Sequence, residues 1–471
     1  MATIGPASDS PETLRALIRA GVDVVRLNLS HGQLADHIAL LQVIRAAAAE
    51  LQSPLAILAD LPGPKVRAGG FPEGGVRLEV GMTLRLLPGE AASSDSVIFV
   101  DYPSLLDDVQ AGDRLVVGDG AITMIVTAAG PDGLQATVDN GGLVQGRPGI
   151  HLPSERLRLT APTDEDLRLA VAMASEGVDF IAISFVRGAN DIEQVRAAIA
   201  PSAALLVAKI ETIPAVANLE AIAKVADAIM VARGDLGIEC PLEDVPHLQK
   251  KIIRHCVEVG VPVITATQML ESMIQSPAPT RAEVSDVANA VFDGTDAVML
   301  SAETAIGQDP VLVVQTMGRI AERAEAEANY SKWGARLGRV QRRYWSDSSD
   351  RITMAITHAC AQAAGDAGAE AILCCTRSGR TARAMARFRP SAQLIGLSPD
   401  PATVRALSLS WGVMPLQVET RASTDDLVWF AVESAVRAGL VTNGSTVAVL
   451  AGAPDRPSGA ATDVLRLVRV G

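Results

Sequence analysis

Charged residues follow two apolar runs that lie close together near the middle of the chain. One run leads into Lys209 and Glu211, and the next leads into Arg233 and Asp235. A short uninterrupted apolar run is typical of a strand that is buried on both faces. Charge at the end of such a strand is costly to bury unless it is paired or holds a metal. The pattern therefore predicts a site for a divalent metal and an acidic, phosphorylated substrate at one end of a sheet.

Composition narrows the class of protein. The chain has 471 residues, 48% of them hydrophobic, and a net charge of −13, which indicates roughly three domains with apolar cores. The negative charge argues against nucleic acid as a partner, although a local basic pocket could still bind a small anion. No apolar run is long enough to cross a membrane, the N-terminus has no secretory signal, and five scattered cysteines favour a reducing compartment. We therefore expect a cytoplasmic protein that does not bind membranes.

Strand–helix units recur along most of the chain. Three apolar strands precede residue 68, and five more are expected at about 178–184, 204–210, 228–233, 262–266 and 296–301. Eight such units predict a closed parallel barrel with its chemistry at the carboxyl ends of the strands. The stretch between the two groups has short alternating strands and many turn residues, which indicate an inserted β-rich module.

The predicted fold class is α/β. It combines a parallel (β/α)8 TIM barrel, an inserted small β-barrel module and a C-terminal α/β regulatory domain with an open sheet. The predicted bounds are 1–67 and 158–340 for the two parts of the barrel, 68–157 for the inserted lid module and 341–471 for the C-terminal domain. Ser10, Thr163 and Thr280 are predicted to cap the starts of helices.

Seven motifs run through the chain in order: ATIGPAS (2–8), RLNLSHG (26–32), GPKVR (63–67), KIET (209–212), MVARGDLG (230–237), ATQMLESM (266–273) and LSAET (300–304). On these motifs the chain resembles the pyruvate kinases over essentially its whole length. The resemblance implies transfer of the phosphoryl group of phosphoenolpyruvate to ADP, giving pyruvate and ATP in glycolysis, with allosteric control and a homotetramer. It also implies more residues before ATIGPAS, so we expect a short first barrel strand.

The resemblance implies a metal site made by two carboxylates. Glu211 and Asp235 match the family's ligands of Mg²⁺, with Mn²⁺ as an alternative ion, and hard oxygen ligands suit such ions. Lys209 matches the cation beside the moving phosphoryl group, where fixed charge stabilises the developing enolate oxygen. The alternative is that the carboxylates only form strand-end salt bridges with Lys209 and Arg233.

Three further residues match contacts to the substrate. Arg26 matches a phosphate-binding arginine, a role that suits its planar fork. Gly234 matches the glycine where the backbone approaches the substrate and its amide can bind a carboxylate oxygen. Thr267 matches the threonine that helps to deliver the proton that makes pyruvate. Each has a structural alternative, namely a surface ion pair, a turn glycine and a strand-end hydroxyl.

The nucleotide, ADP or ATP, is expected to contact Asn28, His31 and Arg67, which match the family's residues. A lone histidine such as His31 more often has a structural role. The family also uses a lysine from the end of the inserted module. Pro148 stands at that position here, so the neighbouring Arg147 is the candidate replacement.

A monovalent-cation site is implied at Asn28, Ser30, Asp60 and the backbone of Leu61. Potassium-dependent members of the family carry an acidic residue where this chain has Lys65. One fixed ammonium group near phosphate can replace the charge of one bound ion. We therefore predict an enzyme that needs Mg²⁺ but not K⁺.

An effector site is implied in the last domain, at Thr376, Arg377, Ser378, Gly379, Arg380 and Thr381. These residues follow a strand and open a helix, and their amides, hydroxyls and guanidinium groups are typical of a phosphate site. The match to the family's effector loop implies binding of a sugar phosphate or a nucleotide, with the loop 452–462 closing over it. The alternative is an ordinary capped turn.

Two rival functions stay open on the sequence alone. One is a Mg²⁺-dependent TIM-barrel lyase or aldolase of the phosphoenolpyruvate/pyruvate class, which would need neither the inserted module nor Arg67. The other is a non-catalytic sugar-phosphate sensor, and the intact Lys209, Glu211 and Thr267 argue against it.

Overall fold

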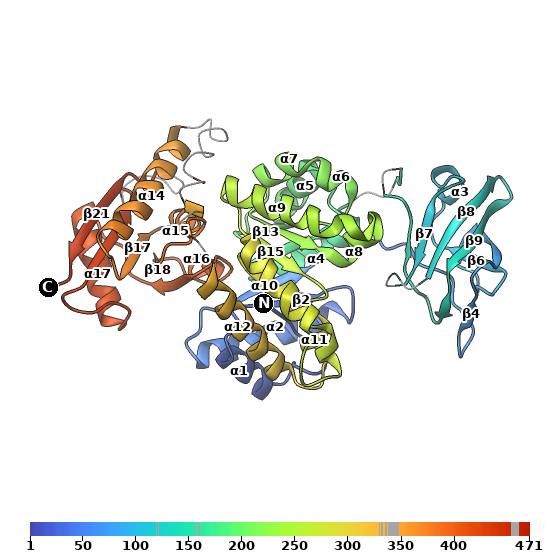
Figure 1. Cartoon of the computed structure of the whole chain (residues 1–471), viewed down its shortest axis with the longest axis horizontal. Helices are drawn as coiled ribbons and strands as arrows, with labels where there is room; N and C mark the ends of the chain where they lie inside the picture. The colour runs from blue at the N-terminus through green and yellow to red at the C-terminus, as the bar shows by residue number, and fades with distance from the viewer. Residues whose placement is uncertain are drawn as a thin grey trace.

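In the computed structural model of the chain, three bodies follow one another along the longest axis (Figure 1). The barrel lies in the middle, the inserted module on one side and the C-terminal domain on the other. The structure describes residues 1–118, 120, 122–154, 156–158, 161–328, 330, 333–334, 337, 348–453 and 461–471. The predicted boundary at 340/341 lies outside these residues.

The barrel consists of eight parallel strands that follow the order of the chain: β1 (Ala2–Thr3), β2 (Val24–Asn28), β3 (Ala56–Asp60), β12 (Phe180–Ile183), β13 (Leu205–Ile210), β14 (Ala228–Ala232), β15 (Val263–Ala266) and β16 (Ala297–Met299). The circle closes where Thr3 N–H donates to Leu300 O and Leu300 N–H donates to Met1 O, each at 3.0 Å. The predicted eight-stranded barrel is therefore confirmed, and its first strand is short, as expected.

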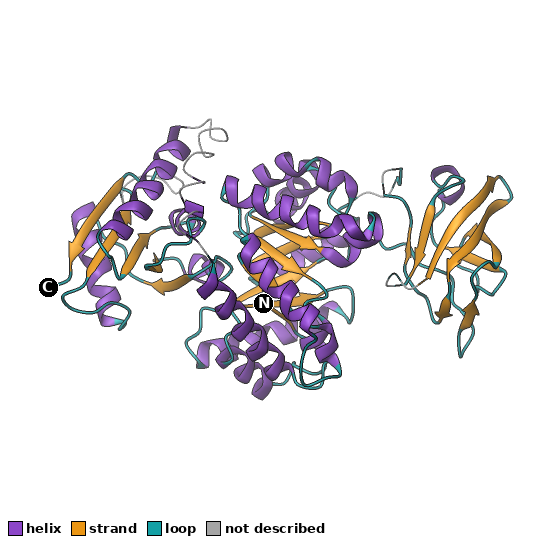
Figure 2. Cartoon of the chain, viewed as in Figure 1, coloured by secondary structure: helices purple, strands orange, loops and turns teal. Residues whose placement is uncertain are grey.

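Helices surround the barrel strands (Figure 2). The longer ones are α1 (Pro11–Arg19), α2 (Leu34–Glu50), α4 (Asp164–Ser175), α5 (Ala189–Ile199), α7 (Leu219–Val225), α9 (Val245–Val259), α10 (Arg281–Asp293) and α12 (Pro310–Glu327). Shorter ones at the strand ends are α6 (Ile213–Ala217), α8 (Arg233–Glu239), α11 (Ala302–Ala305) and the 3-10 turns η1 (Leu242–Asp244) and η2 (Glu271–Ile274).

The predicted helix starts are confirmed by their caps. The Ser10 side chain accepts a hydrogen bond from the first turn of α1. Thr163 and Thr280 form capping boxes with Asp166 and Glu283, respectively. Each such cap stabilises its helix by about 1 kcal/mol.

The inserted module has its own apolar core and two sheets. Its elements are β4 (Val76–Leu78), β5 (Thr83–Pro88), β6 (Val97–Val100), α3 (Leu105–Asp108), β7 (Arg114–Val117), β8 (Ile122–Gly130), β9 (Gly133–Asn140), β10 (Gly142–Val144) and β11 (Ile150–His151). Six strands pair in the order β11-β7-β8-β9-β5-β6, and β10 pairs with β4. The sequence predicts short alternating strands at 76–80, 83–86, 114–117 and 122–126, which correspond to β4, β5, β7 and β8, and it misses the others.

The C-terminal domain is an open sheet with helices on both faces (Figures 1 and 2). Its elements are α14 (Ser348–Asp366), β17 (Ala371–Cys375), α15 (Arg380–Ala386), β18 (Gln393–Ser398), α16 (Pro401–Leu407), β19 (Val413–Gln417), α17 (Thr424–Arg437), β20 (Thr446–Ala451) and β21 (Val464–Arg469). The strand order is β19-β18-β17-β20-β21, and only the pairing of β21 with β20 is antiparallel among these strands. The sequence predicts helices at about 352–366, 380–388 and 424–438 and strands at about 370–375, 393–397 and 446–450, and it misses α16, β19 and β21.

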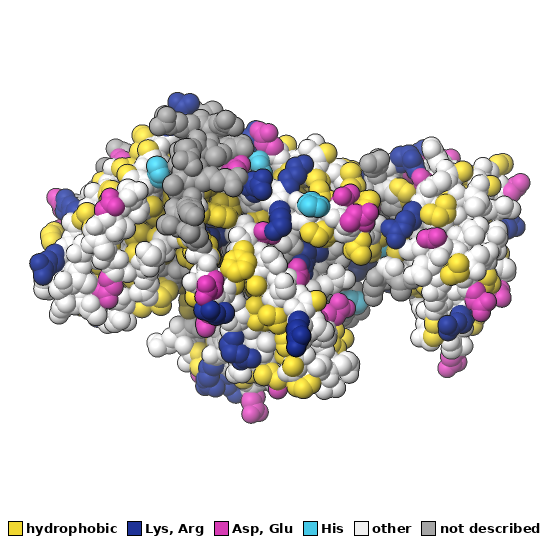
Figure 3. Space-filling model, viewed as in Figure 1, with side chains coloured by type: hydrophobic (Ala, Val, Ile, Leu, Met, Phe, Trp, Pro, Cys, Tyr) yellow, Lys and Arg dark blue, Asp and Glu magenta, His cyan; other side chains and the backbone are white. Residues whose placement is uncertain are grey.

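Acidic and basic side chains are interspersed over the face of the molecule shown in Figure 3. Within the described residues, no helix is both long and apolar enough to cross a membrane.

Candidate active site

Strand parity decides which charged side chains face the mouth of the barrel. On β13, Val207 belongs to the apolar layer inside the barrel, whereas Leu206 and Ala208 pack toward the surrounding helices. Side chains alternate along a strand, so Lys209 and Glu211 have the parity of Val207. They therefore face inward at the carboxyl end, where barrel enzymes place their chemistry.

The same parity brings together two residues of neighbouring strands. Val24 of β2 and Leu58 of β3 lie in the interior layer, so Arg26 and Asp60, at the next positions of equal parity, also face inward. Arg26 Nε donates to Asp60 Oδ2 at 2.6 Å, and Arg26 Nη1 donates to Thr3 Oγ1 at 3.1 Å. The expected phosphate-binding arginine is thus held by the buried wall of the barrel.

Lys209 is the centre of an ionic cluster that also contains Arg26, Asp60 and Glu211. Its Nζ lies 2.8 Å from Glu211 Oε1 and 3.2 Å from Asp60 Oδ1, and it donates to Ser184 Oγ at 2.7 Å. Ser184 Oγ in turn donates to Leu61 O at 2.7 Å. One ammonium group therefore links the ends of three strands.

Burial disfavours the charged forms of the side chains in this cluster, but nearby opposite charges outweigh the effect of burial. Burial would raise the pKa of Asp60, but Lys209 and Arg26 hold that pKa below its usual value. Burial would lower the pKa of Lys209, yet the carboxylates of Asp60 and Glu211 raise it. Lys209 and Asp60 are therefore both charged at neutral pH.

Two carboxylates at this site suit a hard divalent cation. Glu211 and Asp235 line the same cavity. Burial and the negative charge of Asp235 raise the pKa of Glu211 to about 7, although the positive charge of Lys209 acts in the opposite direction. Among the described residues, the Asp235 carboxylate has no hydrogen-bond or ion-pair partner, and no cluster of three or more His, Cys, Asp or Glu is placed to hold a metal. Mg²⁺ commonly binds through one or two carboxylates together with water and phosphate oxygens, so these residues fit it.

A cavity of about 440 Å³ lies between the barrel mouth and the inserted module. The predicted residues that line it are Arg26, Asn28, Ser30, His31, Lys65, Arg67, Lys209, Glu211 and Asp235. Asp60 and Leu61 are buried beside Lys209 and Ser184 and are not among the lining residues. Gly234 and Thr267 are not among them either.

Gly234 and Thr267 contact each other. Gly234 N–H donates to Thr267 Oγ1 at 2.8 Å, and the Thr267 hydroxyl donates to Ala266 O at 2.6 Å. Thr267 has a φ of 67°, a conformation that costs a non-glycine residue roughly 1–3 kcal/mol. The amide that we expected to meet a substrate carboxylate is thus engaged by the Thr267 hydroxyl.

Arg233 turns away from the charged cluster around Lys209. Its Nη1 donates to Asp286 Oδ2 at 2.6 Å, and its Nη2 donates to Thr267 O at 2.6 Å and Gln268 O at 3.2 Å. Arg233 is not among the residues that line the cavity. Its charge therefore holds the segment after β15 in place, which separates it from the cluster around Lys209.

Sequence reasoning missed Ser184 and Phe185, which follow β12. Ser184 links Lys209 to Leu61, and Phe185 N–H donates to Glu211 Oε2 at 2.7 Å. Phe185 has a φ of 55°, so its amide is aimed by a strained turn. The signal that could have found these residues is their position at the carboxyl end of a buried strand.

The expected nucleotide contacts lie at the same cavity. Asn28, His31 and Arg67 all line it. Burial, together with the charges of Lys65 and Arg67, lowers the pKa of His31, so its ring is neutral at neutral pH. Arg147 lies 3.7 Å from Asp101 in the inserted module and is not among the lining residues.

Oxygens of three of the four residues in the expected monovalent-cation site have partners within the protein. Asn28 Oδ1 accepts from Ser30 N–H at 3.2 Å, and Leu61 O accepts from Ser184 Oγ. Asp60 is held by Arg26 and Lys209.

Lys65 extends into the same region. Burial and the positive charges of Arg67 and Lys209 lower its pKa, while Asp235 and Asp60 act in the opposite direction. These influences place the Lys65 ammonium within electrostatic reach of both carboxylates.

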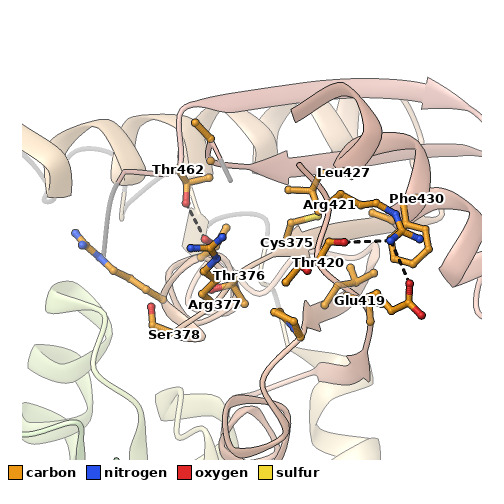
Figure 4. Close-up of a pocket in the computed structure, with 18 of the residues that line it drawn as sticks. Cys375, Thr376, Arg377, Ser378, Glu419, Thr420, Arg421, Leu427, Phe430 and Thr462 are labelled. Atoms are coloured by element: carbon orange, nitrogen blue, oxygen red, sulfur yellow. Dashed lines mark hydrogen bonds and ion pairs between the residues drawn. The ribbon is translucent and has the colours of Figure 1, made fainter. Parts of the chain in front are cut away.

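A second cavity, of about 100 Å³, lies in the C-terminal domain (Figure 4). It is lined by Thr376, Arg377, Ser378, Arg380 and Thr381, and Gly379 caps α15 with a φ of 77°. On the opposite wall, Arg421 lies over the Phe430 ring at 3.5 Å. Thr381 Oγ1 and Thr462 Oγ1 share a hydrogen bond of 2.7 Å. Of the loop 452–462, residues 454–460 lie outside the described part of the chain.

Comparisons with known proteins match both the barrel and the last domain. The family model described as "Pyruvate kinase, barrel domain" matches residues 1–314, and "Pyruvate kinase, alpha/beta domain" matches residues 354–468. The pyruvate kinase of Clostridium acetobutylicum is 39% identical over 470 residues, which cover 99% of this chain and 98% of that protein. The enzyme of Geobacillus stearothermophilus is 41% identical over 457 residues, covering 96% and 77%.

A comparison with solved structures points to the same family. The crystal structure of a pyruvate kinase from Cryptosporidium parvum superposes with a TM-score of 0.92 at 33% sequence identity, covering 100% of this chain and 95% of that one. The two family models together cover the barrel, its inserted module and the C-terminal domain, and the relatives align over nearly the whole chain. The chain therefore belongs to the pyruvate kinase family, the phosphotransferases that make pyruvate and ATP from phosphoenolpyruvate and ADP in glycolysis.

Proposed function

We propose that phosphoryl transfer takes place at the barrel mouth, with Lys209 as its central cation. The observation that carries this proposal is that Lys209 Nζ contacts both Asp60 and Glu211 while the side chain lines the large cavity. A cation fixed by buried carboxylates needs no reorganisation when charge develops beside it. Its contribution to the reaction is therefore electrostatic.

The reaction moves one phosphoryl group between two oxygens. The bond from phosphorus to the enol oxygen of phosphoenolpyruvate breaks, and a bond from phosphorus to a terminal oxygen of ADP forms. Lys209 stabilises the negative charge left on the enol oxygen, and Arg26 binds the phosphoryl oxygens through its guanidinium fork. The enolate then takes one proton at carbon to give pyruvate.

Glu211 and Asp235 are proposed to hold Mg²⁺, with Mn²⁺ as an alternative. When bound, the ion supplies positive charge that neutralises phosphate oxygens and fixes their orientation. Support comes from the raised pKa of Glu211 and from the free carboxylate of Asp235 within the described residues.

Thr267 is proposed to deliver the proton, directly or through water, and Gly234 to bind the substrate carboxylate through its amide. The hydrogen bond between Gly234 N–H and Thr267 Oγ1 makes the two groups one unit. A substrate carboxylate that binds the Gly234 amide would have to displace the Thr267 hydroxyl. This displacement would free the hydroxyl for proton transfer.

The ADP phosphates are proposed to lie along Asn28, His31 and Arg67. All three line the cavity. Neutral His31 can hydrogen-bond a phosphate or sugar oxygen, whereas Arg67 supplies charge. We assign no nucleotide role to Arg147.

The enzyme is proposed not to need K⁺. Lys65 lines the cavity and carries a positive charge within electrostatic reach of Asp60 and Asp235, and the oxygens of Asn28 and Leu61 already accept hydrogen bonds. Filling the site with K⁺ would break these bonds and add a charge that Lys65 already supplies.

The second cavity is proposed to bind a sugar phosphate or a nucleotide as an allosteric effector. Thr376, Arg377, Ser378, Arg380 and Thr381 line it together with Arg421 and Phe430. Titrating sugar phosphates and AMP into a phosphoenolpyruvate saturation curve tests this, and half-saturation unchanged by all of them would refute it. A homotetramer and a cytoplasmic location are proposed from the family.

A coupled assay tests the whole assignment. Pyruvate formed from phosphoenolpyruvate is followed with lactate dehydrogenase and NADH, with and without ADP and with and without K⁺. Strict dependence on ADP is expected. Pyruvate formation without ADP would favour a lyase or aldolase. If no pyruvate forms under any of the four conditions, the result would favour a non-catalytic sensor.

A further inference from the structure

A turn with the sequence Pro-Gly-Pro, residues 62–64, leads from the end of the barrel strand β3 to Lys65. Proline has no backbone N–H, so Gly63 carries the one amide donor of the turn. Within the part of the chain that the structure describes, the hydrogen bond from Gly63 N–H is also the only one made by any residue from 62 to 65. The position of Lys65 therefore depends on what holds Gly63.

Asp166 holds this amide from the far side of the inserted module in the sequence. Its Oδ1 accepts from Gly63 N–H at 2.9 Å, although the two residues lie 103 positions apart in the chain. Asp166 is 1% exposed, and a hydrogen bond from an amide to a carboxylate is stronger than one between neutral groups. The turn is thereby fixed to α4, the first barrel helix after the module.

The second oxygen of the same carboxylate serves the start of α4. Asp166 Oδ2 accepts from Thr163 N–H at 2.9 Å and from the Thr163 hydroxyl at 2.7 Å, while Thr163 Oγ1 accepts from Asp166 N–H at 3.0 Å. These three bonds complete the capping box without Oδ1. The bond to Gly63 is therefore additional to the helix cap, and the cap holds the carboxylate in place for it.

Gly63 also packs tightly against the residues that support Lys209. It has a φ of 70°, and a Cβ atom at this position would lie 2.7 Å from Phe185 Cδ2 and 2.9 Å from Ser184 Cβ. Both separations are too short for carbon atoms, so only glycine fits here. The turn is thus held by the Asp166 carboxylate and by close contact with residues 184–185.

We propose that Asp166 is a positioning residue for Lys65 and acts through the Gly63 amide. Lys65 follows the turn directly and lines the cavity, and within the described residues its ammonium group has no hydrogen-bond or ion-pair partner. Such a group provides a preorganised charge beside Asp60 only if the backbone that carries it is fixed. This inference rests on the proposed role of Lys65 in replacing K⁺.

Asp166→Asn separates the two tasks of the carboxylate. An amide has one acceptor oxygen, which the two donors of Thr163 should retain, so the NH2 group faces Gly63 N–H and the bond to the turn is lost. Initial rates in K⁺-free buffer should fall several-fold and recover at least in part when K⁺ is added. Thr163→Ala is the matched control, because it removes the hydroxyl of the cap but keeps the bond to Gly63. It should melt at a lower temperature and show no stimulation by K⁺.

Circular dichroism and thermal unfolding of the same full-length samples establish that each variant is folded. Asp166→Gln is the second variant, because glutamine at this helix position also completes a capping box, and it should show the same stimulation by K⁺. If both Asp166 variants are as independent of K⁺ as Thr163→Ala, Asp166 is only a helix cap and the inference is overturned.

A double-mutant cycle with Lys65→Met identifies the residue through which Asp166 acts. In the Lys65→Met background, Asp166→Asn should have no further effect on the rate in K⁺-free buffer. A further drop as large as in the unmodified protein would show that Asp166 acts elsewhere, which overturns the inference.

The single variant Lys65→Met separates this inference from the proposed function. If it leaves the rate in K⁺-free buffer unchanged, the role proposed for Lys65 fails and this inference fails with it. If it lowers that rate while the Asp166 variants behave like Thr163→Ala, only this inference fails.

Discussion

Lys209 Nζ and Asp60 Oδ1 lie 3.2 Å apart at the mouth of the barrel, although the whole inserted module separates these residues in the sequence. The contact exists because β3 pairs directly with β12, and β12 with β13, on either side of the insertion. The module therefore leaves the register of the barrel intact. The charged cluster depends on that register, since a slip of one residue would turn Lys209 toward the helices.

Lys209→Met should lower kcat by at least about 100-fold, the order expected for one preorganised electrostatic group. It also leaves Asp60 and Glu211 buried without their shared cation, so some loss of stability is expected. Activity in the lactate dehydrogenase-coupled assay is compared with circular dichroism of the same sample. Lys224→Met, at an exposed ion pair with Glu220, is the matched control. A folded Lys209→Met protein with normal kcat would contradict the assignment.

Glu211→Gln should weaken Mn²⁺ and Mg²⁺ binding about 10- to 100-fold, a range seen for changes around metal sites. Glutamine keeps the shape of the side chain and the acceptor for Phe185 N–H but removes the charge. Isothermal titration of the metal without substrate is the measurement. Glu239→Gln changes another carboxylate that lines the same cavity and should leave the affinity within a factor of two or so. Equal losses in both variants would rule out a specific ligand role.

The sequence predicted the barrel well because its strands are buried on both faces and read as uninterrupted apolar runs. The missed strands are of another kind. β19 (VMPLQ) contains a proline and lies at the edge of its sheet, and β21 (VLRLVR) lies at the other edge with arginines among its apolar residues. Edge strands pack on fewer neighbours, so their sequences carry a weaker signal.

The candidate site shows a similar limit. Charge at the ends of β13 and β14 was visible in the sequence, but the direction of each side chain was not. Arg233 follows β14 and opens α8, so helix geometry rather than strand parity sets its direction, and it meets Asp286 of α10. A helix that begins at the strand end is therefore what separates Arg233 from Lys209.

Lys65→Glu should convert the enzyme from K⁺-independent to K⁺-dependent. The change removes the fixed charge near Asp60 and Asp235 and adds a negative one, so a bound cation becomes necessary to restore the balance. Initial rates in K⁺-free buffer should fall at least about tenfold in the variant, equivalent to one lost favourable charge contact of roughly 1.4 kcal/mol, and recover on adding K⁺. The initial rate of Lys65→Met in K⁺-free buffer should also fall, and adding K⁺ should restore it only in part. Strong K⁺ stimulation of the unmodified enzyme would refute the hypothesis.

Asp286→Asn should lower kcat more than it changes KM. Asp286 holds Arg233, and Arg233 holds the carbonyls of Thr267 and Gln268, so the variant loosens the proposed proton donor without touching the substrate pocket. Since the Asp286 side chain is 37% exposed, solvent screening limits the loss of stability to about 1 kcal/mol or less. Steady-state kinetics and thermal unfolding check the two effects. Glu165→Gln, which loses an exposed ion pair with Arg168 on α4, should leave kcat unchanged.

Glu283 gives a prediction with a defined direction in pH. Its carboxylate accepts from Ser272 N–H at 2.7 Å and from Thr280 N–H at 2.7 Å, and although burial would raise its pKa, these hydrogen bonds and those of the two hydroxyls lower it. A lowered folded pKa stabilises the protein above the pKa of the unfolded chain, and that stability is lost as pH falls through the folded pKa. Glu283→Gln should therefore melt below the unmodified protein at neutral pH, and the difference should shrink as the pH drops below about 4. Thermal unfolding from neutral to acid pH measures this, with exposed Glu90→Gln as the control. A difference that stays constant over the whole range would mean that shape, and not the charge of Glu283, fixes the segment between Thr267 and α10.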